Sequence, residues 1–320
     1  MSGDTVNITA KRPAAARRIL VTGGAGFIGS HVAKALLNAG YQVTVLDDLS
    51  SGRPENVPPG ATLVQGDIRS DHLPSLLKEI RPGGVVHCAA QVSVAASVED
   101  PLNDASRNIS GTINLLRSSA SAGASTFVYA SSAAIYGAPE YLPVDERHPT
   151  RPESPYGLSK LTAESYVRLL APQLGLRWVC LRYANVYGPG QRAAGDGAVV
   201  PAFLNAFAAG RDPVIQDDGE QTRDFIHVED VGQANLMALA GDASGVFNVG
   251  SGLAVTINAL WKLSASLMNW DRPPRYGPRR SGDIRHSRLS SEAGERALGW
   301  APAIALEEGL RLTVASLRQP

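Results

Sequence analysis

The chain alternates short runs of β-branched and other apolar residues with longer segments of helical periodicity. In the segment 31–40, Val32, Leu36 and Leu37 share one helical face, and Gly40 provides a stop. Strand-like runs cover residues 17–23, 41–47, 61–67, 83–89, 125–131 and 176–183, and helical patterns cover 71–80, 101–121 and 155–171. This strict alternation predicts an α/β fold with a doubly wound parallel sheet covered by helices on both faces.

The alternation breaks down after about residue 185. The stretch 187–203 is rich in glycine, proline and polar residues, which is typical of a loop that covers a site at the carboxyl ends of strands. Residues 224–240 read as a strand that enters a helix and returns to the first domain. We therefore expect a tail at 1–16, a Rossmann-like domain at 17–185 plus about 224–246, and a smaller mixed α/β substrate-binding lobe at about 186–223 plus 247–320.

Composition and charge narrow the possible partners. Hydrophobic residues make up 44% of the 320 positions, and 30 basic residues balance 30 acidic ones, so electrostatics gives no reason to expect nucleic acid or an anionic membrane as a partner. No apolar run approaches the length of a membrane span, and the N-terminal stretch has no apolar signal segment. Cys88 and Cys180 lie in strand-like runs, which favours buried thiols over a disulfide. We expect a cytoplasmic protein.

The segment 22–30, TGGAGFIGS, lies between the first expected strand and the first expected helix. Gly23, Gly26 and Gly29 allow a tight turn, a close approach of the backbone to a pyrophosphate, and close packing of helix against strand. The free N–H groups and the dipole of the helix N-terminus attract phosphate. A glycine-rich turn alone is a weak signal, but this strand–turn–helix context predicts a dinucleotide site.

An acidic residue at the end of the second strand bears on the choice of dinucleotide. Asp47 lies about twenty residues beyond the glycines, where a carboxylate accepts hydrogen bonds from both ribose hydroxyls and repels a 2′-phosphate. This placement favours NAD over NADP. Arg53 is the opposing observation, because an arginine near this position can receive a 2′-phosphate.

Several motifs follow in order along the chain from residue 18. They are TGGAGFIGS at 22–30, Asp47 and Asp48, GDI at 66–68, HCAA at 87–90, NISGTINLL at 108–116, SSAAIYG at 131–137, YGLSK at 156–160, RYANVYGPGQ at 182–191 and TRDFIHVEDV at 222–231. Together they resemble the extended short-chain dehydrogenase/reductase family, and within it the nucleotide-sugar 4-epimerases. The resemblance implies bound NAD that is used catalytically, a UDP-sugar substrate, and a transient 4-keto sugar.

The chemistry of a tyrosine and a lysine four residues apart can be argued from the residues themselves. Lys160 shares a helical face with Tyr156, so its ammonium can lie near the phenol. A free tyrosine has a pKa of about 10, and lowering it to about 7 requires roughly 4 kcal/mol of preferential stabilisation of the anion. One close ammonium and the positive nicotinamide of oxidised NAD can supply this. Tyr156 is therefore the expected general base, the role that the family's YxxxK motif implies.

The resemblance assigns further residues to the cofactor and to the reacting hydroxyl. Ser132 matches the catalytic serine or threonine, which hydrogen-bonds the reacting sugar hydroxyl. Asn108 matches a motif position that supports the backbone around the site. The expected cofactor-binding residues are Gly23, Gly26, Phe27, Ile28, Gly29, Asp47, Asp48, Asp67, Ile68, Ala89, Ala90, Gln91, Asn108, Tyr156, Lys160, Tyr183 and Val186.

Departures from related enzymes narrow the reaction. Dehydratases of this family carry an Asp-Glu pair where this chain has Ala133 and Ala134, and two methyl groups cannot act as acid and base. Decarboxylases place a glutamate in the same stretch, and its absence argues against them less strongly. A reductase remains an alternative. So does a non-catalytic NAD-binding regulator, although such proteins commonly lose the tyrosine or lysine that is intact here.

Substrate contacts also follow from the resemblance. Arginine suits diphosphate because its planar group can pair with two phosphate oxygens. Gln216 departs from the aromatic residue often found at its position, which leaves the uridine assignment less certain. The matched positions are Asn185, Arg223 and Arg280 at the diphosphate, Asp283 near the nucleotide ribose, and Val199 and Gln216 beside the uracil.

Arg192 bears on which sugar is bound. It lies in a loop expected to reach the sugar end of the pocket, where a cation suits a C6 carboxylate and a neutral hexose needs none. An exposed loop arginine without a partner is an equally valid interpretation. We favour UDP-glucuronate/UDP-galacturonate as the substrate pair, with UDP-glucose/UDP-galactose as the alternative.

Two expectations concern assembly and metals. Helices near 101–121 and 155–171 pair across a two-fold axis in many relatives, so the resemblance implies a homodimer. The six histidines show no spacing typical of metal ligands, and we expect no metal.

Overall fold

The computed structural model describes residues 18–192, 199–279 and 283–317. Its centre is a seven-stranded sheet in the order β11-β6-β5-β4-β1-β2-β3, and all of its strand pairs are parallel. The strand order reverses between β1 and β4, the arrangement that opens a binding crevice at the carboxyl ends of the strands. The Rossmann-like fold expected from the sequence is confirmed. The strands are β1 (Arg18–Thr22), β2 (Gln42–Asp47), β3 (Thr62–Gln65), β4 (Gly84–His87), β5 (Thr126–Ser132), β6 (Arg177–Tyr183) and β11 (Gly245–Val249).

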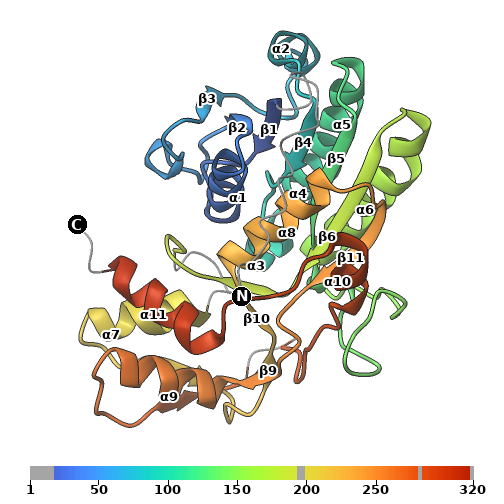
Figure 1. Ribbon diagram of the computed structural model, residues 1–320. Coiled ribbons are helices and arrows are strands. Elements are labelled where there is room, and N and C mark those ends of the chain that lie inside the picture. Colours follow the sequence, from blue (N-terminus) through green and yellow to red (C-terminus); the bar gives the residue numbers. More distant parts are fainter. Residues whose placement is uncertain (1–17, 193–198, 280–282, 318–320) are drawn as a thin grey trace, which may run out of the picture.

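Helices cover both faces of this sheet (Figure 1). On one face, α1 (Phe27–Asn38) and α8 (Val228–Ala240) bury apolar side chains such as Leu36 and Val231 against the strands. The opposite face is covered by α2 (Leu73–Ile80), α5 (Gly111–Ser121) and α6 (Pro155–Gln173). Strands buried on both faces are the reason for the nearly continuous apolar runs in the sequence.

Short elements connect strands and helices around the crevice. The expected helix at 101–121 is a continuous helical run in three parts, with a π-helical turn in its middle. These elements are η2 (Pro54–Asn56), α3 (Val94–Glu99), α4 (Pro101–Ala105), the π-turn η3 (Ser106–Ser110), and η4 (Ala133–Ile135).

A second, smaller group of elements packs below the carboxyl ends of the sheet (Figure 1). Its own apolar core includes Phe203, Trp261 and Leu310. Two-stranded pairings β10-β7, β12-β9 and β13-β8 complete it. The elements are β7 (Asn185–Tyr187), α7 (Val199–Ala208), β8 (Val214–Gln216), β9 (Thr222–Arg223), β10 (Phe225–His227), β12 (Val255–Thr256), α9 (Ile257–Leu267), β13 (Arg275–Gly277) and α11 (Leu306–Leu317).

The structure differs from the expected boundaries in three places. The stretch 187–203 is not a loop throughout, because α7 begins at Val199 and buries Val200 and Phe203. β11 extends the sheet to Val249, beyond the expected limit of about 246. Helix α10 (Glu292–Leu298) and Trp300 were expected in the second lobe from their position in the sequence. They pack instead against the apolar core between the sheet and helices α1 and α8. In each case apolar side chains distant in sequence supply the packing partner.

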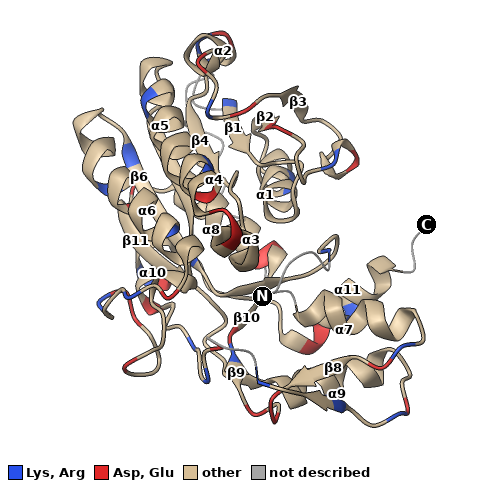
Figure 2. Ribbon diagram, turned by 180° about the vertical axis from the view of Figure 1, so that it is seen from behind, with Lys and Arg blue, Asp and Glu red and all other residues tan. Residues whose placement is uncertain are grey.

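The state of the two cysteines and the distribution of charged residues agree with the expectations from the sequence. Cys88 and Cys180 are both free, as expected. Basic and acidic residues are interspersed along the ribbon (Figure 2). Among the described residues, no helix combines the length and apolar character needed to cross a membrane.

Candidate active site

A large pocket opens at the carboxyl ends of the central strands. Gly23 after β1, Ala89 after β4, Ser132 at the end of β5 and Tyr183 at the end of β6 all line it. This is the edge of the sheet where doubly wound folds bind their ligands. The second lobe contributes Asn205 of α7 and Leu317 of α11 to the lining.

The glycine turn at one side of the pocket has the geometry needed to hold a diphosphate. Gly23 has a φ of +70°, and a Cβ there would lie 2.6 Å from the backbone nitrogen of Ala89. A Cβ on Gly29 would collide with the carbonyl oxygen of Gly23. Gly26 caps α1 without a side-chain hydrogen bond, so first-turn N–H groups remain available for an anion. The turn therefore fits the pyrophosphate of a dinucleotide.

Asp47, the last residue of β2, is held in place by backbone groups. Its carboxylate oxygens accept hydrogen bonds from the N–H of Ala25 at 2.9 Å and from the N–H of Leu49 at 2.9 Å. Asp47 lines the pocket, where its remaining acceptor capacity can serve ribose hydroxyls. Arg53 is exposed, and the pocket lining includes Gly52 and Asn56 around it rather than Arg53 itself. This geometry suits NAD.

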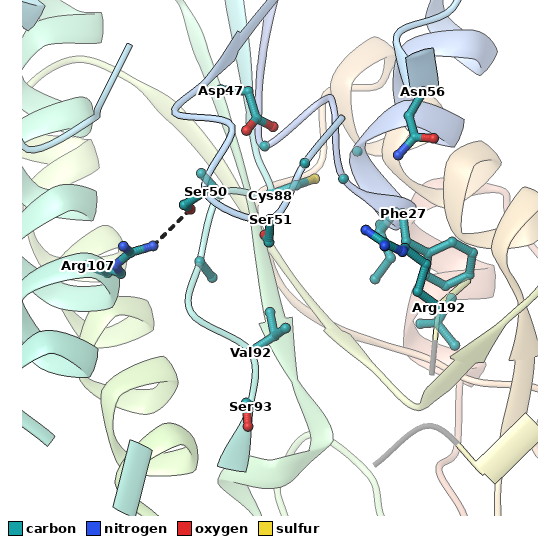
Figure 3. A pocket seen from close by; sticks show the side chains of 18 of the residues that line it. Phe27, Asp47, Ser50, Ser51, Asn56, Cys88, Val92, Ser93, Arg107 and Arg192 are labelled. Atoms are coloured by element: carbon teal, nitrogen blue, oxygen red, sulfur yellow. Dashed lines mark hydrogen bonds between the residues drawn. The ribbon is translucent and has the colours of Figure 1, made fainter. Parts of the chain in front are cut away.

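A second group of charged residues lines the pocket near Asp47. Arg69 donates to both carboxylate oxygens of Asp67, with an Nη2–Oδ2 distance of 2.6 Å, and these hydrogen bonds lower the pKa of Asp67. Arg107 donates to Ser50 at 3.1 Å, as the dashed line in Figure 3 shows. Asp48 and Asp67 belong to sequence motifs and were expected here, whereas neither arginine belongs to a local motif.

Ser132 and Tyr156 both line the pocket. Tyr156 is the second residue of α6, whose N-terminus is capped by the Ser154 hydroxyl, which accepts from the N–H of Gly157 at 3.1 Å. The Tyr156 N–H donates to the hydroxyl of Ser97 at 3.1 Å. Burial raises the pKa of Tyr156 above its usual value, and the hydrogen bond with Ser132 lowers it. The structure thus brings the expected base and the expected serine together.

Lys160 lies one helical turn after Tyr156 and is buried against the sheet. Its ammonium lies 4.6 Å from the centroid of the Tyr129 ring in β5, a cation–π arrangement. Burial lowers the pKa of Lys160 to about 8. Lys160 is only 3% exposed and does not belong to the pocket lining, whereas Tyr156 does. Lys160 is therefore buried behind the pocket surface.

Asn108 supports the backbone beside the pocket, as expected. It accepts from the N–H of Gln91 at 2.8 Å, and its amide group donates to the carbonyl of Gln91 at 3.0 Å and to the hydroxyl of Ser159 at 3.0 Å. The Gln91 side chain is in turn bound to Asp104 at 2.8 Å. Asn108 and Gln91 lie outside the pocket lining. Their role in cofactor binding therefore remains a prediction, and the predicted role is an indirect one, to support the backbone beside the pocket.

The expected substrate residues divide into two groups. Asn185 and Arg192 line the pocket, and Asn185 also donates to the carbonyl of Asp224 at 3.1 Å. Arg223 forms an ion pair with Asp283, the expected ribose partner. Arg223, Asp283, Val199 and Gln216 lie outside the lining, in the second lobe, so their roles remain predictions. Arg280 lies outside the described residues.

The segment that carries Arg192 is tied to both domains. His31 of α1 hydrogen-bonds the carbonyl of Pro189 through Nε2 at 3.0 Å, and the Gln191 side chain donates to the carbonyl of Val186 at 3.0 Å. In Figure 3 the labelled Arg192 side chain projects over the same side of the pocket as Phe27. Arg192 is exposed and belongs to the pocket lining.

Comparisons with known proteins agree with this geometry. The model of the NAD dependent epimerase/dehydratase family matches residues 19–250. UDP-glucose 4-epimerase of Mycolicibacterium smegmatis is 40% identical over 309 residues, which cover 94% of this chain and 98% of that protein. The structure of UDP-glucose 4-epimerase from Thermotoga maritima with UDP-glucose has a TM-score of 0.89 and 43% identity and covers 94% of this chain and 98% of that chain. The Thermus thermophilus UDP-glucose 4-epimerase, solved in complex with NAD, has a TM-score of 0.88 and 40% identity, with 94% of this chain and 99% of that chain covered.

The chain belongs to the NAD dependent epimerase/dehydratase family. The resemblance to nucleotide-sugar 4-epimerases of the extended short-chain dehydrogenase/reductase family is confirmed, as are the isomerase class and NAD as the cofactor. The fold, the glycine turn and the serine–tyrosine pair are the features of this chain that carry the assignment.

Proposed function

We propose that this protein interconverts UDP-glucose and UDP-galactose by epimerisation at C4 of the sugar. The observation that carries the proposal is the pair of Ser132 and Tyr156, which line the same pocket as the glycine turn of residues 23–29. The neutral-hexose pair is the alternative in the sequence analysis, and it takes precedence here because the matched relatives are named UDP-glucose 4-epimerase.

Different residues of the chain would bind the cofactor and transfer the proton in this reaction. NAD, when bound, supplies a group that accepts the C4 hydride and returns it within one turnover. Gly23, Gly26 and Gly29 would hold its diphosphate, and Asp47 would hold its adenosine ribose. Tyr156 takes the proton of the 4-hydroxyl and later returns it.

Two neighbours of Tyr156 favour this proton transfer. Ser132 lines the pocket with Tyr156, lowers the pKa of that tyrosine, and can bond the reacting hydroxyl. Lys160 adds a buried positive charge one helical turn away, which favours the phenolate through Coulomb attraction. Because the hydride would return to the carbon that it left, no net oxidation occurs, and its return to the opposite face of the sugar would invert C4.

Arg192 gives a specific reason to keep UDP-glucuronate/UDP-galacturonate as a second candidate pair. It is an exposed cation in the pocket lining, and the guanidinium group pairs well with a carboxylate. A carboxylate at C6 would distinguish this pair from the neutral sugars. The two candidates therefore make different predictions for the same substitution.

The test measures kcat/KM for UDP-galactose and for UDP-galacturonate, with products identified by NMR. We expect the wild type to favour UDP-galactose by about tenfold or more, which corresponds to about 1.4 kcal/mol, and Arg192→Ala to leave that preference unchanged. Arg211→Ala, at an exposed site outside the pocket lining, is the matched control. A wild-type preference for the uronate that Arg192→Ala removes would replace the neutral-sugar proposal with the uronate pair.

We also infer that the protein forms a homodimer through α3, α4 and α6. Large apolar side chains are exposed along these helices, including Val98 at 63%, Leu102 at 82%, Leu158 at 55% and Leu169 at 60%. These three helices are in mutual contact, and large apolar side chains exposed on neighbouring helices favour protein–protein contact. The cytoplasmic location remains a prediction.

A further inference from the structure

Arg107, which belongs to none of the family motifs, makes a contact across the dinucleotide pocket. The contact joins Arg107, in the π-turn η3, to the loop that follows β2 (Figure 3). The Arg107 guanidinium donates from Nη1 to the Ser50 hydroxyl at 3.1 Å and lies 3.7 Å from Oδ2 of Asp48. All three side chains line the pocket. Arg107 therefore bridges two walls of the cofactor site that lie 57 residues apart in sequence.

The arginine is oriented toward this loop by its own helix. Its Nε donates to the side-chain oxygen of Asn103 at 3.3 Å, one helical turn earlier. The adjacent Asn108 is buried and accepts a hydrogen bond from the N–H of Gln91. The turn that carries Arg107 is therefore held in place. A planar guanidinium with its donors directed in this way makes a geometrically specific contact.

The loop after β2 is bound on its other side to the glycine turn. Arg53 donates its N–H to the carbonyl of Ala25 at 3.0 Å, and Asn56 donates its amide to the same carbonyl at 2.9 Å. Ser50 and Asp48 are linked internally, because Oδ1 of Asp48 accepts from both the N–H and the hydroxyl of Ser50, at 2.9 and 2.6 Å. The loop is thus held to the turn beneath it at one end and to Arg107 at the other.

We propose that Arg107, Ser50 and Asp48 form a clasp that slows dissociation of the dinucleotide. We call these three residues the clasp. In a 4-epimerase the hydride taken from C4 must return to the same sugar, so a cofactor released in its reduced form leaves behind an oxidised sugar and an inactive enzyme. While the cofactor is reduced, the contact holds the loop after β2 against the opposite wall. It thereby keeps the pocket closed around the adenosine end of the dinucleotide. Arg107 is in this sense a positioning residue.

The expected size of the effect follows from the exposure of the pair. The side chains of Arg107 and Asp48 are 30% and 32% exposed, so their attraction is partly screened by solvent. Contacts of this kind change an equilibrium or rate by about two- to fivefold. Because salt weakens such attraction, the clasp also predicts faster release at high ionic strength in the wild type than at low ionic strength.

The experiment measures release of NADH from the loaded holoenzyme by stopped-flow fluorescence after mixing with excess NAD. We expect Arg107→Ala to accelerate release about two- to fivefold, and Ser50→Ala to accelerate it less. Arg117→Ala, an exposed arginine on the same helical run and outside the pocket lining, is the control and should release NADH at the wild-type rate. Thermal unfolding of each variant reports any general loss of structure.

The double variant Ser50→Ala/Arg107→Ala separates the clasp from a direct contact. If Arg107 acts through Ser50, the double variant releases NADH no faster than Arg107→Ala, because the two substitutions remove the same interaction. Multiplied effects would mean that Arg107 contacts the dinucleotide on its own, and this would overturn the clasp. Release from Arg107→Ala within about 1.5-fold of wild type would overturn it as well. If Arg107→Ala does not fold, Asp48→Asn removes the charge attraction and should give a smaller acceleration that high salt no longer increases.

Discussion

Replacing Glu164 by alanine should break a buried ion pair that fastens α6, the helix of Tyr156 and Lys160, to the sheet. The Glu164 carboxylate accepts two hydrogen bonds from Arg182 of β6, from Nη2 at 2.6 Å and from Nε at 3.1 Å. It also accepts one from the hydroxyl of Ser131 at 2.7 Å, in β5. The side chains of Glu164 and Arg182 are only 1% and 4% exposed. Lys160 lies one turn before Glu164, and Ser132 directly follows Ser131.

The magnitude follows from the charge that alanine would leave behind. Arg182 would keep its hydrogen bond to the hydroxyl of Tyr136 at 2.8 Å but lose its carboxylate in a buried place. Breaking one side of a buried pair costs about 3–5 kcal/mol. A protein of 320 residues unfolds with an entropy of about 0.7 kcal/mol/K near its midpoint, so the loss corresponds to a decrease in Tm of about 4–7 °C.

The assay is thermal unfolding at pH 7, followed by circular dichroism, for wild type, Glu164→Ala and the double variant Glu164→Met/Arg182→Met. The double variant removes both charges and fills the space with apolar atoms, so we expect it to be more stable than Glu164→Ala. A Tm for Glu164→Ala within about 1 °C of wild type would refute the reasoning. A double variant less stable than the single one would show that the charge left behind is not the cause.

Three further predictions concern the base, a buried histidine and the assembly. Tyr156→Phe should abolish epimerisation, measured by NMR, while the NAD content measured by absorbance stays at the wild-type level; full activity would exclude Tyr156 as the base. Burial lowers the pKa of His87 from 6.5 to about 3, so between these values the unfolded chain binds more protons and stability decreases with falling pH. The wild type should lose about 2 kcal/mol between pH 6.5 and 5 from this group, and His87→Gln should lose less in urea titrations; equal losses would contradict the prediction. Leu158→Glu should yield monomers in size-exclusion chromatography with light scattering, and Leu253→Glu, 59% exposed in the second lobe, should not; a dimeric Leu158→Glu would place the interface elsewhere.

Features that depend on neighbouring residues were predictable from the sequence. The spacing of Gly23, Gly26 and Gly29 between a strand and a helix predicted the turn whose backbone leaves no room for a Cβ at two of its positions. The four-residue separation of Tyr156 and Lys160 placed both on α6. Asp47 ended its strand as expected. Each inference needed only the periodicity of a helix or strand and the stereochemistry of glycine.

Contacts between distant segments were not predictable in this way. Trp300 donates its indole N–H to the carbonyl of Asp230 at 2.9 Å, and the Asp230 carboxylate accepts from the N–H groups of Ala303 and Ile304, each at 3.1 Å. These contacts hold the segment after α10 against α8, yet nothing in either segment marks the other as its partner. The same holds for Asn205 in the pocket wall, since its position depends on how the second lobe packs.

Tyr156 and Lys160 show how burial shifts the protonation equilibria of the two groups. Desolvation disfavours the charged form of each group, which raises the pKa of the tyrosine and lowers that of the lysine to about 8. Both shifts favour a phenol over a phenolate, and the Ser132 hydrogen bond works in the opposite direction. At pH 7 the lysine remains largely protonated, with the Tyr129 ring beneath its ammonium. The spacing of the motif predicts the geometry of the pair, but it does not predict the balance between the effects that raise and lower the pKa of Tyr156. Further positive charge in the pocket is what would make Tyr156 a base.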